Sequence, residues 1–476
     1  MTKKYLIGID GGTQSTKVIV FDLHGNVVCE GRQPLRPMNA PWVGAAEHPD
    51  DDLWDSLIIA SREAMACFPG DPKDIVGAGL CTIRCCRAYL RADGSLAYPV
   101  ISWMDIRCEV PFSFPTDDAC YATTTTGYMT HRLTGEFKDT VANNMIHQWP
   151  VDMTKWNWSD DEELFKAFSI KRDQVFKLCM PGDILGYVTK EASKATGIPE
   201  GIPVVATAND KAVEALGAGI MLNNAGLVSL GTYTTSMFKG ERLLKDPRNH
   251  INNFSCVPNK YLYENPGLHR GMWMISWLRD LFGKGFIDEA AARGISPEAL
   301  LNEEASKVPP CSDGLMTIPE WLSYPIYKKG IMMGFDVRHG RAHMFRSLME
   351  GIVLAIYNKF SAMCQEVGTF PDKIIASGGG SKGDAFVQII SDVFGLPVER
   401  NEVEDAAGMG SAICAAVATD MYPDFESAIE AMVRMRNCFQ PNTDNHVLYT
   451  KMNEDVYCNI TKATDPLLEK AYPLFN

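Results

Sequence analysis

Two short turns rich in glycine and threonine contain residue types that bind phosphate. Residues 11–16 read Gly-Gly-Thr-Gln-Ser-Thr, and residues 231–235 read Gly-Thr-Tyr-Thr-Thr. Glycine lets the backbone approach an anion closely, so that N–H groups and hydroxyls can donate hydrogen bonds to it. Taken alone, either turn is better explained as an ordinary hairpin. Because there are two, one in each half of the chain, we predict two half-sites for one phosphate chain, formed by Gly12, Thr13, Gln14, Ser15, Lys17, Gly231 and Thr232.

Each turn joins two runs of β-branched and apolar residues. Residues 5–10 and 17–22 flank the first turn, and residues 227–230 and 235–238 flank the second. Such runs beside turn residues predict strands. A Walker-type loop would end in Gly-Lys-Ser/Thr and lead directly into a helix, and neither feature is present. We therefore predict that both phosphate loops are hairpin tips, and that Asp10 beside the first tip holds a hydrated Mg²⁺.

Asp210 has a structural and a catalytic explanation. It follows the buried-strand pattern of residues 203–207 and precedes a helix over residues 211–218. Taken alone, an N-cap is the simpler explanation, since aspartate satisfies free N–H groups at a helix start. A carboxylate at the carboxyl end of a strand also faces a ligand crevice, where it could accept a proton from a hydroxyl that attacks phosphorus.

A second glycine cluster has three explanations. Residues 378–383 read Gly-Gly-Gly-Ser-Lys-Gly between a strand pattern and a helix pattern, and Glu399 lies roughly twenty residues on, as in a dinucleotide-binding fingerprint. A nicotinamide-dependent oxidoreductase is therefore an alternative, although little chain remains to complete such a domain. The cluster and the small-residue run 406–412 could instead bind adenosine, or allow close helix packing.

The composition limits the class of partner. The chain has 476 residues, a hydrophobic content of 46% and a formal net charge of −14. An acidic surface repels nucleic acid and anionic membranes, so we expect neither as a partner. No run of about 18 apolar residues is present, and the 14 cysteines show no repeated Cys-x-x-Cys pair. We expect a cytoplasmic protein with a small-molecule substrate, and a homodimer is left open.

The element pattern predicts an α/β fold with two domains. Strands and amphipathic helices alternate up to about residue 240, and the pattern then becomes charged and aperiodic over residues 240–253. Helical patterns cover residues 53–67 and 343–364, and another helix is expected beyond residue 440. We predict an N-terminal domain over residues 1–240 and a C-terminal domain over residues 241–476.

Six motifs, in order along nearly the whole chain, resemble those of the FGGY family of carbohydrate kinases. They are residues 8–13 (Gly-Ile-Asp-Gly-Gly-Thr), 101–107 (Ile-Ser-Trp-Met-Asp-Ile-Arg), 209–211 (Asn-Asp-Lys), 229–232 (Ser-Leu-Gly-Thr), 346–351 (Arg-Ser-Leu-Met-Glu-Gly), and 378–380 (Gly-Gly-Gly) with 391–393 (Ser-Asp-Val). The resemblance implies two actin-like (ribonuclease-H-like) ATPase domains with an interdomain cleft.

The resemblance also implies a reaction and roles for individual residues. It implies transfer of the γ-phosphate of ATP, with Mg²⁺, to a hydroxyl of a sugar or polyol. Asp210 would be the general base and Asp10 the metal-associated carboxylate. Thr13 and Thr232 would contact phosphate, while Gly379 and Gly380, with Lys382, would contact ATP.

The substrate segment departs from the family pattern. Residues 82–86 read Thr-Ile-Arg-Cys-Cys where xylulokinase-like members have Gln-Met-His and glycerol-kinase-like members have Gln-Arg-Glu. Ile83 and Cys85 remove hydrogen-bonding groups that would select a known polyol. Arg84, Trp103, Asp105 and Asp210 are the predicted substrate-binding residues, although Asp105 could equally form an ion pair away from the substrate. A catalytically inactive sugar- or nucleotide-binding sensor remains the other alternative.

Overall fold

The first of two large sheets contains the first phosphate hairpin. The structure, a computed structural model, describes residues 4–321 and 325–475. Its first sheet has the strand order β11-β12-β4-β1-β2-β3. The strands are β1 (Tyr5–Gly11), β2 (Ser15–Asp22), β3 (Val27–Pro34), β4 (Ile75–Thr82), β11 (Ile184–Tyr187) and β12 (Pro203–Asn209). β1, β2 and β3 form the predicted antiparallel meander, β4 and β12 continue it in parallel, and β11 closes the edge antiparallel.

The second sheet contains the second phosphate hairpin and repeats this plan. Its order is β15-β16-β14-β13-β19-β20-β21. The strands are β13 (Ala225–Leu230), β14 (Thr234–Gly240), β15 (Ile251–Phe254), β16 (Tyr261–Glu264), β19 (Lys373–Ser377), β20 (Val398–Asn401) and β21 (Met435–Phe439). β13, β14 and β16 are antiparallel, β19 and β20 are parallel to β13, and β21 is an antiparallel edge. The chain changes sheet between β12 and β13, whereas residue 240 as a domain boundary stays a prediction.

Helices lie around both sheets, and the long helical patterns are confirmed within a few residues. Their bounds are α1 (Asp52–Cys67), α2 (Thr125–Thr134), α3 (Glu162–Ala167), α4 (Lys190–Thr196), α5 (Asp210–Gly217), α6 (Trp273–Leu281), α7 (Gly283–Ala292), α8 (Pro297–Ala305), α9 (Arg341–Val367), α10 (Asp384–Phe394), α11 (Ala406–Ala418), α12 (Phe425–Met432), α13 (Thr443–Met452) and α14 (Cys458–Ala471). Small two-stranded sheets pair β5 (Ala88–Leu90) with β6 (Tyr121–Thr123), β7 (Lys138–Thr140) with β10 (Lys177–Cys179), β8 (Val151–Asp152) with β9 (Asn157–Trp158), and β17 (Met316–Ile318) with β18 (Ile331–Met333).

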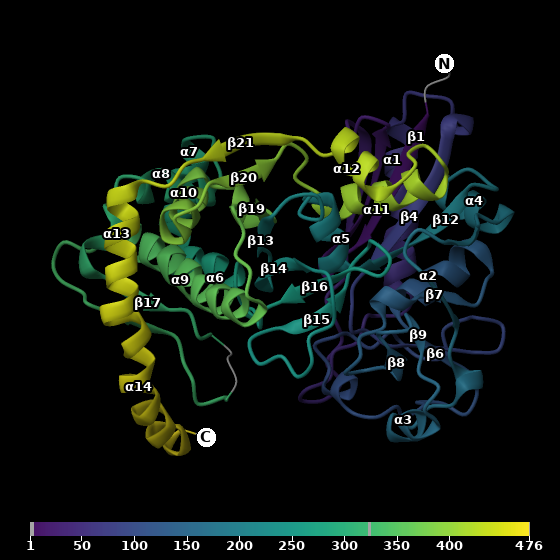
Figure 1. The fold of residues 1–476 in the computed structure, drawn as a ribbon, viewed down its shortest axis with the longest axis horizontal. Helices are drawn as coiled ribbons and strands as arrows, with labels where there is room; N and C mark the ends of the chain where they lie inside the picture. The colour runs from purple at the N-terminus through teal and green to yellow at the C-terminus, as the bar shows by residue number, and fades with distance from the viewer. Residues whose placement is uncertain (1–3, 322–324, 476) are drawn as a thin grey trace.

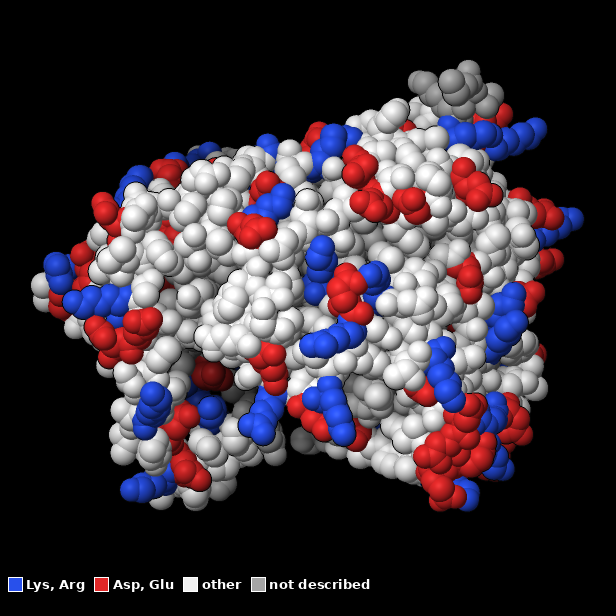
Figure 2. Space-filling view, in the orientation of Figure 1, with Lys and Arg blue, Asp and Glu red and all other residues white. Residues whose placement is uncertain are grey.

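The surface carries charges of both signs. On the face drawn in Figure 2, lysine and arginine side chains are interspersed with aspartate and glutamate. Within residues 4–321 and 325–475, no helix is long and apolar enough to cross a membrane.

Two helices join the halves of the molecule. α11, which comes late in the chain, lies over the first sheet, and it packs there on β1, β4 and α5 (Figure 1). A Cβ atom at Gly8 would lie 2.0 Å from the carbonyl oxygen of Gly408, and one at Gly217 would lie 1.8 Å from that of Ala406. Of the explanations for the small-residue run 406–412, close packing is therefore confirmed.

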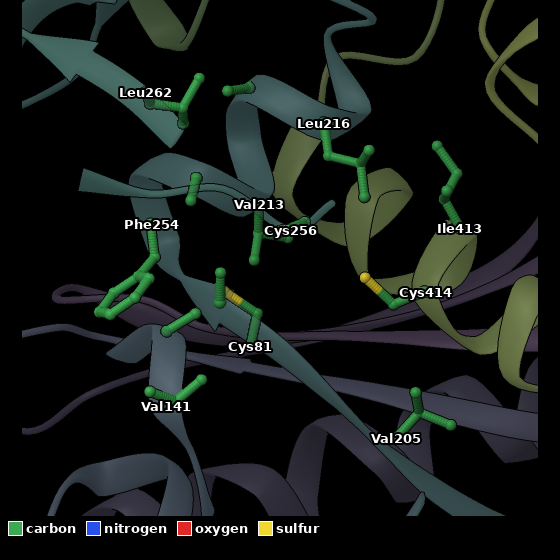
Figure 3. Close-up of a cluster of buried hydrophobic side chains, with 14 of the residues drawn as sticks. Cys81, Val141, Val205, Val213, Leu216, Phe254, Cys256, Leu262, Ile413 and Cys414 are labelled. Carbon is green, nitrogen blue, oxygen red and sulfur yellow. The ribbon is translucent and has the colours of Figure 1, made fainter. Parts of the chain in front are cut away.

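A buried apolar cluster fills this junction. Figure 3 shows that its side chains come from both sheets and both joining helices: Cys81 and Val205, Phe254 and Leu262, Val213 and Leu216, and Ile413 and Cys414. Burial of apolar side chains is the main favourable contribution to such packing. The two hairpins thus sit on a common core, which sets their positions relative to each other.

Candidate active site

A cavity of about 490 Å³ lies between the two hairpin tips and the end of β12. Eleven of the predicted site residues line it: Asp10, Gly12, Thr13, Gln14, Ser15, Lys17, Arg84, Trp103, Asp210, Gly231 and Thr232. A groove of about 990 Å³ shares part of this lining and contains Gly379, Gly380 and Lys382. Asp105 lines neither space.

The two hairpin tips touch each other. Gln14 Nε2 donates a hydrogen bond of 3.1 Å to Thr232 Oγ1, across 218 residues of sequence. The first tip is closed by Gly12 N–H, which donates to the carbonyl oxygen of Ser15 at 3.1 Å. The structure therefore brings together the two turns that the sequence analysis assigned to one phosphate chain, and their binding of phosphate stays a prediction.

Trp103 connects the first tip with the substrate side of the cavity. Its indole Nε1 donates to Thr13 Oγ1 at 3.3 Å. Asp105 lies two residues further along but points elsewhere: its carboxylate is buried, forms an ion pair with Arg107 and accepts from Ala46 N–H. Our prediction that Asp105 lines the substrate pocket is therefore at odds with its position, because all of its contacts hold the surrounding loops in place.

Asp210 is not the cap of α5. Asn209 takes that position, and its side-chain oxygen accepts from Ala212 N–H at 3.1 Å. Asp210 is the first residue of the helix, and no hydrogen bond reaches its Oδ1 within the described residues. Arg84 Nε lies 3.8 Å from that oxygen. Burial raises the pKa of Asp210 above the usual value for aspartate, and Arg84 and Lys211 only partly offset this effect.

Arg84 lines the cavity, and both of its terminal nitrogens are hydrogen-bonded. Nη1 and Nη2 each donate a hydrogen bond of 2.7 Å to one oxygen of Glu264. Burial alone would lower the pKa of Arg84, but Glu264 raises it well above its usual value, so the side chain remains charged. The guanidinium thus faces Asp210 only through Nε.

Asp10 shares a lysine with a second carboxylate. Lys17 Nζ lies 3.3 Å from Asp10 Oδ2 and also pairs with Asp405, the N-cap of α11. Burial and the nearby charge of Asp405 raise the pKa of Asp10 to about 7, while Lys17 opposes the shift.

These residues fit a magnesium ion that is bound mainly by phosphate. Two carboxylates share one ammonium group, which leaves net negative charge, and Mg²⁺ prefers carboxylate oxygens. In the described ranges, no group of three or more His, Cys, Asp or Glu side chains could hold a metal on its own. Sites that use one or two carboxylates together with substrate phosphates have this composition.

The second glycine cluster forms part of the nucleotide-sized groove. Gly378 has φ +84°, and a Cβ atom there would lie 2.7 Å from the carbonyl oxygen of Leu230. A short 3₁₀ turn over Gly379–Lys382 separates the glycines from α10. Glu399, the acid that a dinucleotide fingerprint would use for ribose, instead pairs with Lys373 at 2.7 Å.

Comparison with known proteins shows the family to which the chain belongs. A model of the N-terminal domain of the FGGY family of carbohydrate kinases matches residues 5–112 and 117–217, and a model of the C-terminal domain matches residues 226–419. The chain belongs to the FGGY family of carbohydrate kinases. It is therefore a carbohydrate kinase, and ATP is the phosphoryl donor in this family. The comparisons give no support to an oxidoreductase.

Individual relatives match nearly the whole chain. An uncharacterised sugar kinase, YgcE, of Escherichia coli (strain K12) is 48% identical over 100% of this chain and 97% of its own length. An autoinducer-2 kinase of Enterobacter sp. (strain 638) is 26% identical over 94% of this chain and 92% of its own length. The structure of a gluconate kinase from Lactobacillus acidophilus superposes with a TM-score of 0.82 at 20% identity, over 97% of this chain and 98% of that one, which confirms the predicted fold.

The sequence analysis did not identify several residues that line the cavity or contact its lining. Lys211 Nζ donates to Glu214 at 2.9 Å and to Ser229 at 2.8 Å, and so links α5 to β13. Arg32, on β3, donates through Nε to Ser15 Oγ at 3.2 Å. His147 and His269 also line the cavity. Lys211 is the last residue of the Asn-Asp-Lys motif but was given no role, whereas the positions of the others depend on strand pairing and loop conformation that no local pattern shows.

Proposed function

We propose that this kinase transfers the γ-phosphate of ATP to a hydroxyl of a neutral sugar or polyol, with Asp210 as the general base. The observation that carries the proposal is the state of Asp210. Its Oδ1 is buried without a hydrogen bond, although Asp210 follows the end of β12 and lines the cavity that both phosphate hairpins line. Native buried polar atoms nearly always have a partner, so an unpaired one indicates a ligand or a reaction.

The environment of Asp210 suits a base. Its raised pKa makes it a better proton acceptor than an exposed aspartate, while Arg84 Nε at 3.8 Å is too far to occupy the carboxylate. A substrate hydroxyl that donates to Asp210 would lose its proton as the oxygen attacks phosphorus.

The opposite side of the cavity suits a triphosphate. Residues of both hairpin tips line it, and Thr13 and Thr232 contribute hydroxyls that could donate to phosphate oxygens. Arg32 lines both the cavity and the adjoining groove, and forms no ion pair within the described residues. Its guanidinium can therefore approach phosphate. Mg²⁺, held by Asp10 when bound, would neutralise charge on the transferred phosphate.

The charges of the substrate side favour a neutral acceptor. Arg84 is paired with Glu264, and Lys211 is paired with Glu214, so neither cation is free for a substrate carboxylate. Apolar and weakly polar side chains contribute much of the remaining wall: Ile83, Cys85, Met145 and Ile251. A sugar acid would therefore bring an uncompensated charge into the site, which is costly.

A panel of acceptors tests this substrate class. ADP release from Mg-ATP would be measured with polyols, ketoses, aldoses and deoxysugars, and with sugar acids matched to the aldoses, such as gluconate to glucose. We expect signals only from neutral compounds, and loss of those signals in Asp210→Asn. A signal confined to sugar acids would refute the neutral class, and an unchanged signal in Asp210→Asn would refute the base.

A cytoplasmic location and a homodimer stay predictions.

A further inference from the structure

A chain of buried side chains connects Asp210 to the second sheet. Arg84 follows β4 in the first sheet. Its guanidinium forms a bidentate ion pair with Glu264 at the end of β16 in the second sheet. Glu264 also accepts from Asn253 Nδ2 at 3.1 Å. Asn253 in turn accepts from Asn209 Nδ2 at 2.9 Å, and Asn209 caps the helix that begins with Asp210. This series of hydrogen-bonded side chains therefore reaches Asp210 both through Arg84 and through Asn209.

Glu264 is the centre of this chain. It is fully buried, as are Asn253 and Asn209. Both of its oxygens accept from Arg84, and one accepts from Asn253 as well. A buried carboxylate is costly unless it is paired and hydrogen-bonded, and here both conditions are met. Bidentate pairing also fixes the plane of the guanidinium, which a single contact would not.

We propose that Glu264 is a positioning residue for phosphoryl transfer, which holds Arg84 beside Asp210 and cancels its positive charge there. The proposal rests on Asp210 being the general base. Because Nη1 and Nη2 both donate to Glu264, Arg84 is held with Nε 3.8 Å from Asp210 Oδ1. Without Glu264, the guanidinium would be free to pair with Asp210, which would occupy the carboxylate and weaken it as a base.

Titratable groups from several elements interact electrostatically with Asp210. They are Arg84 after β4, Lys211 and Glu214 on α5, Glu264 on β16 and Asp10 on β1, together with the thiols of Cys81, Cys85 and Cys86. Lys211 is neutralised by Glu214 at 2.9 Å, just as Arg84 is by Glu264. Each of these two cations thus has its own carboxylate, and Glu264 and Glu214 counter the lowering of the pKa of Asp210 by Arg84 and Lys211.

The test compares the pH dependence of kcat/KM in three variants. ADP release from Mg-ATP would be followed with the best acceptor of the panel, and with water as the acceptor when no sugar is added. In Glu264→Gln, the charge of Arg84 is no longer balanced, so the acid limb of the pH profile should move to lower pH by about one unit. kcat on the plateau should fall by up to about tenfold, the limit for a base weakened by one pKa unit.

The other two variants test the direction of the shift in the acid limb of the pH profile. Arg84→Met leaves Glu264 unpaired near Asp210, so the acid limb should move to higher pH. The double variant Arg84→Met/Glu264→Gln removes both charges, so its limb should return close to that of the wild type. If Glu264→Gln fails to fold, the comparison of Arg84→Met with the double variant provides the same test.

Glu350→Gln is a matched control. Glu350 belongs to another buried arginine–glutamate pair, with Arg346 at 2.9 Å, away from the cavity. We expect it to lower stability without moving the acid limb. If the acid limb of the pH profile does not move in Glu264→Gln either, the proposal is overturned, whatever the loss of kcat. A residue that only supports the structure would lower kcat without moving that limb. If Asp210→Asn kept full activity, the base itself would be wrong, so the two failures are distinguishable.

Discussion

Replacing Gly8 with alanine tests the packing that holds the two hairpins together. Gly8 is in β1, two residues before Asp10, and α11 lies directly over it. A Cβ atom at this position would lie 2.0 Å from the carbonyl oxygen of Gly408. Real Cβ atoms do not approach so closely, so β1 and α11 must separate in the Gly8→Ala variant.

The expected loss follows from two opposing effects. Overpacking a core costs about 1–3 kcal/mol, and the upper part of that range applies because a backbone oxygen cannot rotate away. Alanine also restricts the unfolded chain, which stabilises the fold by about 0.5–1 kcal/mol. The net loss in the free energy of unfolding is therefore about 2 kcal/mol.

Urea denaturation measures this loss. With a slope of about 3 kcal/mol/M, the midpoint should fall by about 0.7 M. Gly285→Ala on α7 is the matched control, because its Cβ atom would meet nothing within 4 Å. That substitution should stabilise the protein by about 0.5–1 kcal/mol, as alanine does in a helix. A Gly8→Ala variant as stable as the wild type would refute the close packing of α11 on β1.

Three further predictions concern ligand contacts, each read from steady-state kinetics. Arg32→Met should raise KM for ATP about tenfold through loss of a charge-assisted hydrogen bond, and an unchanged KM would show that Arg32 does not reach phosphate. Trp103→Phe removes the donor to Thr13 and should lower kcat/KM for the acceptor by about 2–10-fold, whereas no loss would exclude a role for that bond. Glu399→Gln should leave KM for ATP within about twofold of the wild type, because the carboxylate pairs within the sheet, and a large rise would instead place it at the nucleotide.

Much of the fold was predictable because its signals are local. The meander around residues 11–16 was marked by β-branched runs on either side of a turn, and the same pattern around residues 231–235 marked the second hairpin. α1 and α9 were found from their apolar periodicity. The two acidic residues could be placed because Asp10 lies near the end of the buried strand β1 and Asp210 directly follows the buried strand β12.

The parts that escaped prediction depend on contacts between distant segments. Glu264 meets Arg84 only because β16 lies next to the edge strand β15 in the second sheet, and nothing around residue 264 signals that pairing. Asp105 was misplaced because its motif does not show which way the loop turns its side chain. The cap of α5 is Asn209 and not Asp210, a difference of one residue that backbone geometry decides and residue preference does not.

The most direct test of the central claim is the effect of Asp210→Asn on turnover and on ATP binding in the same preparation. Asparagine preserves the shape of the side chain but cannot accept the proton from the substrate hydroxyl. If Asp210 is the general base, kcat should fall by about 10²–10⁴-fold, while the Kd for Mg-ATP stays within about twofold of the wild type. A variant that binds Mg-ATP normally and turns over at close to the wild-type rate would contradict the account.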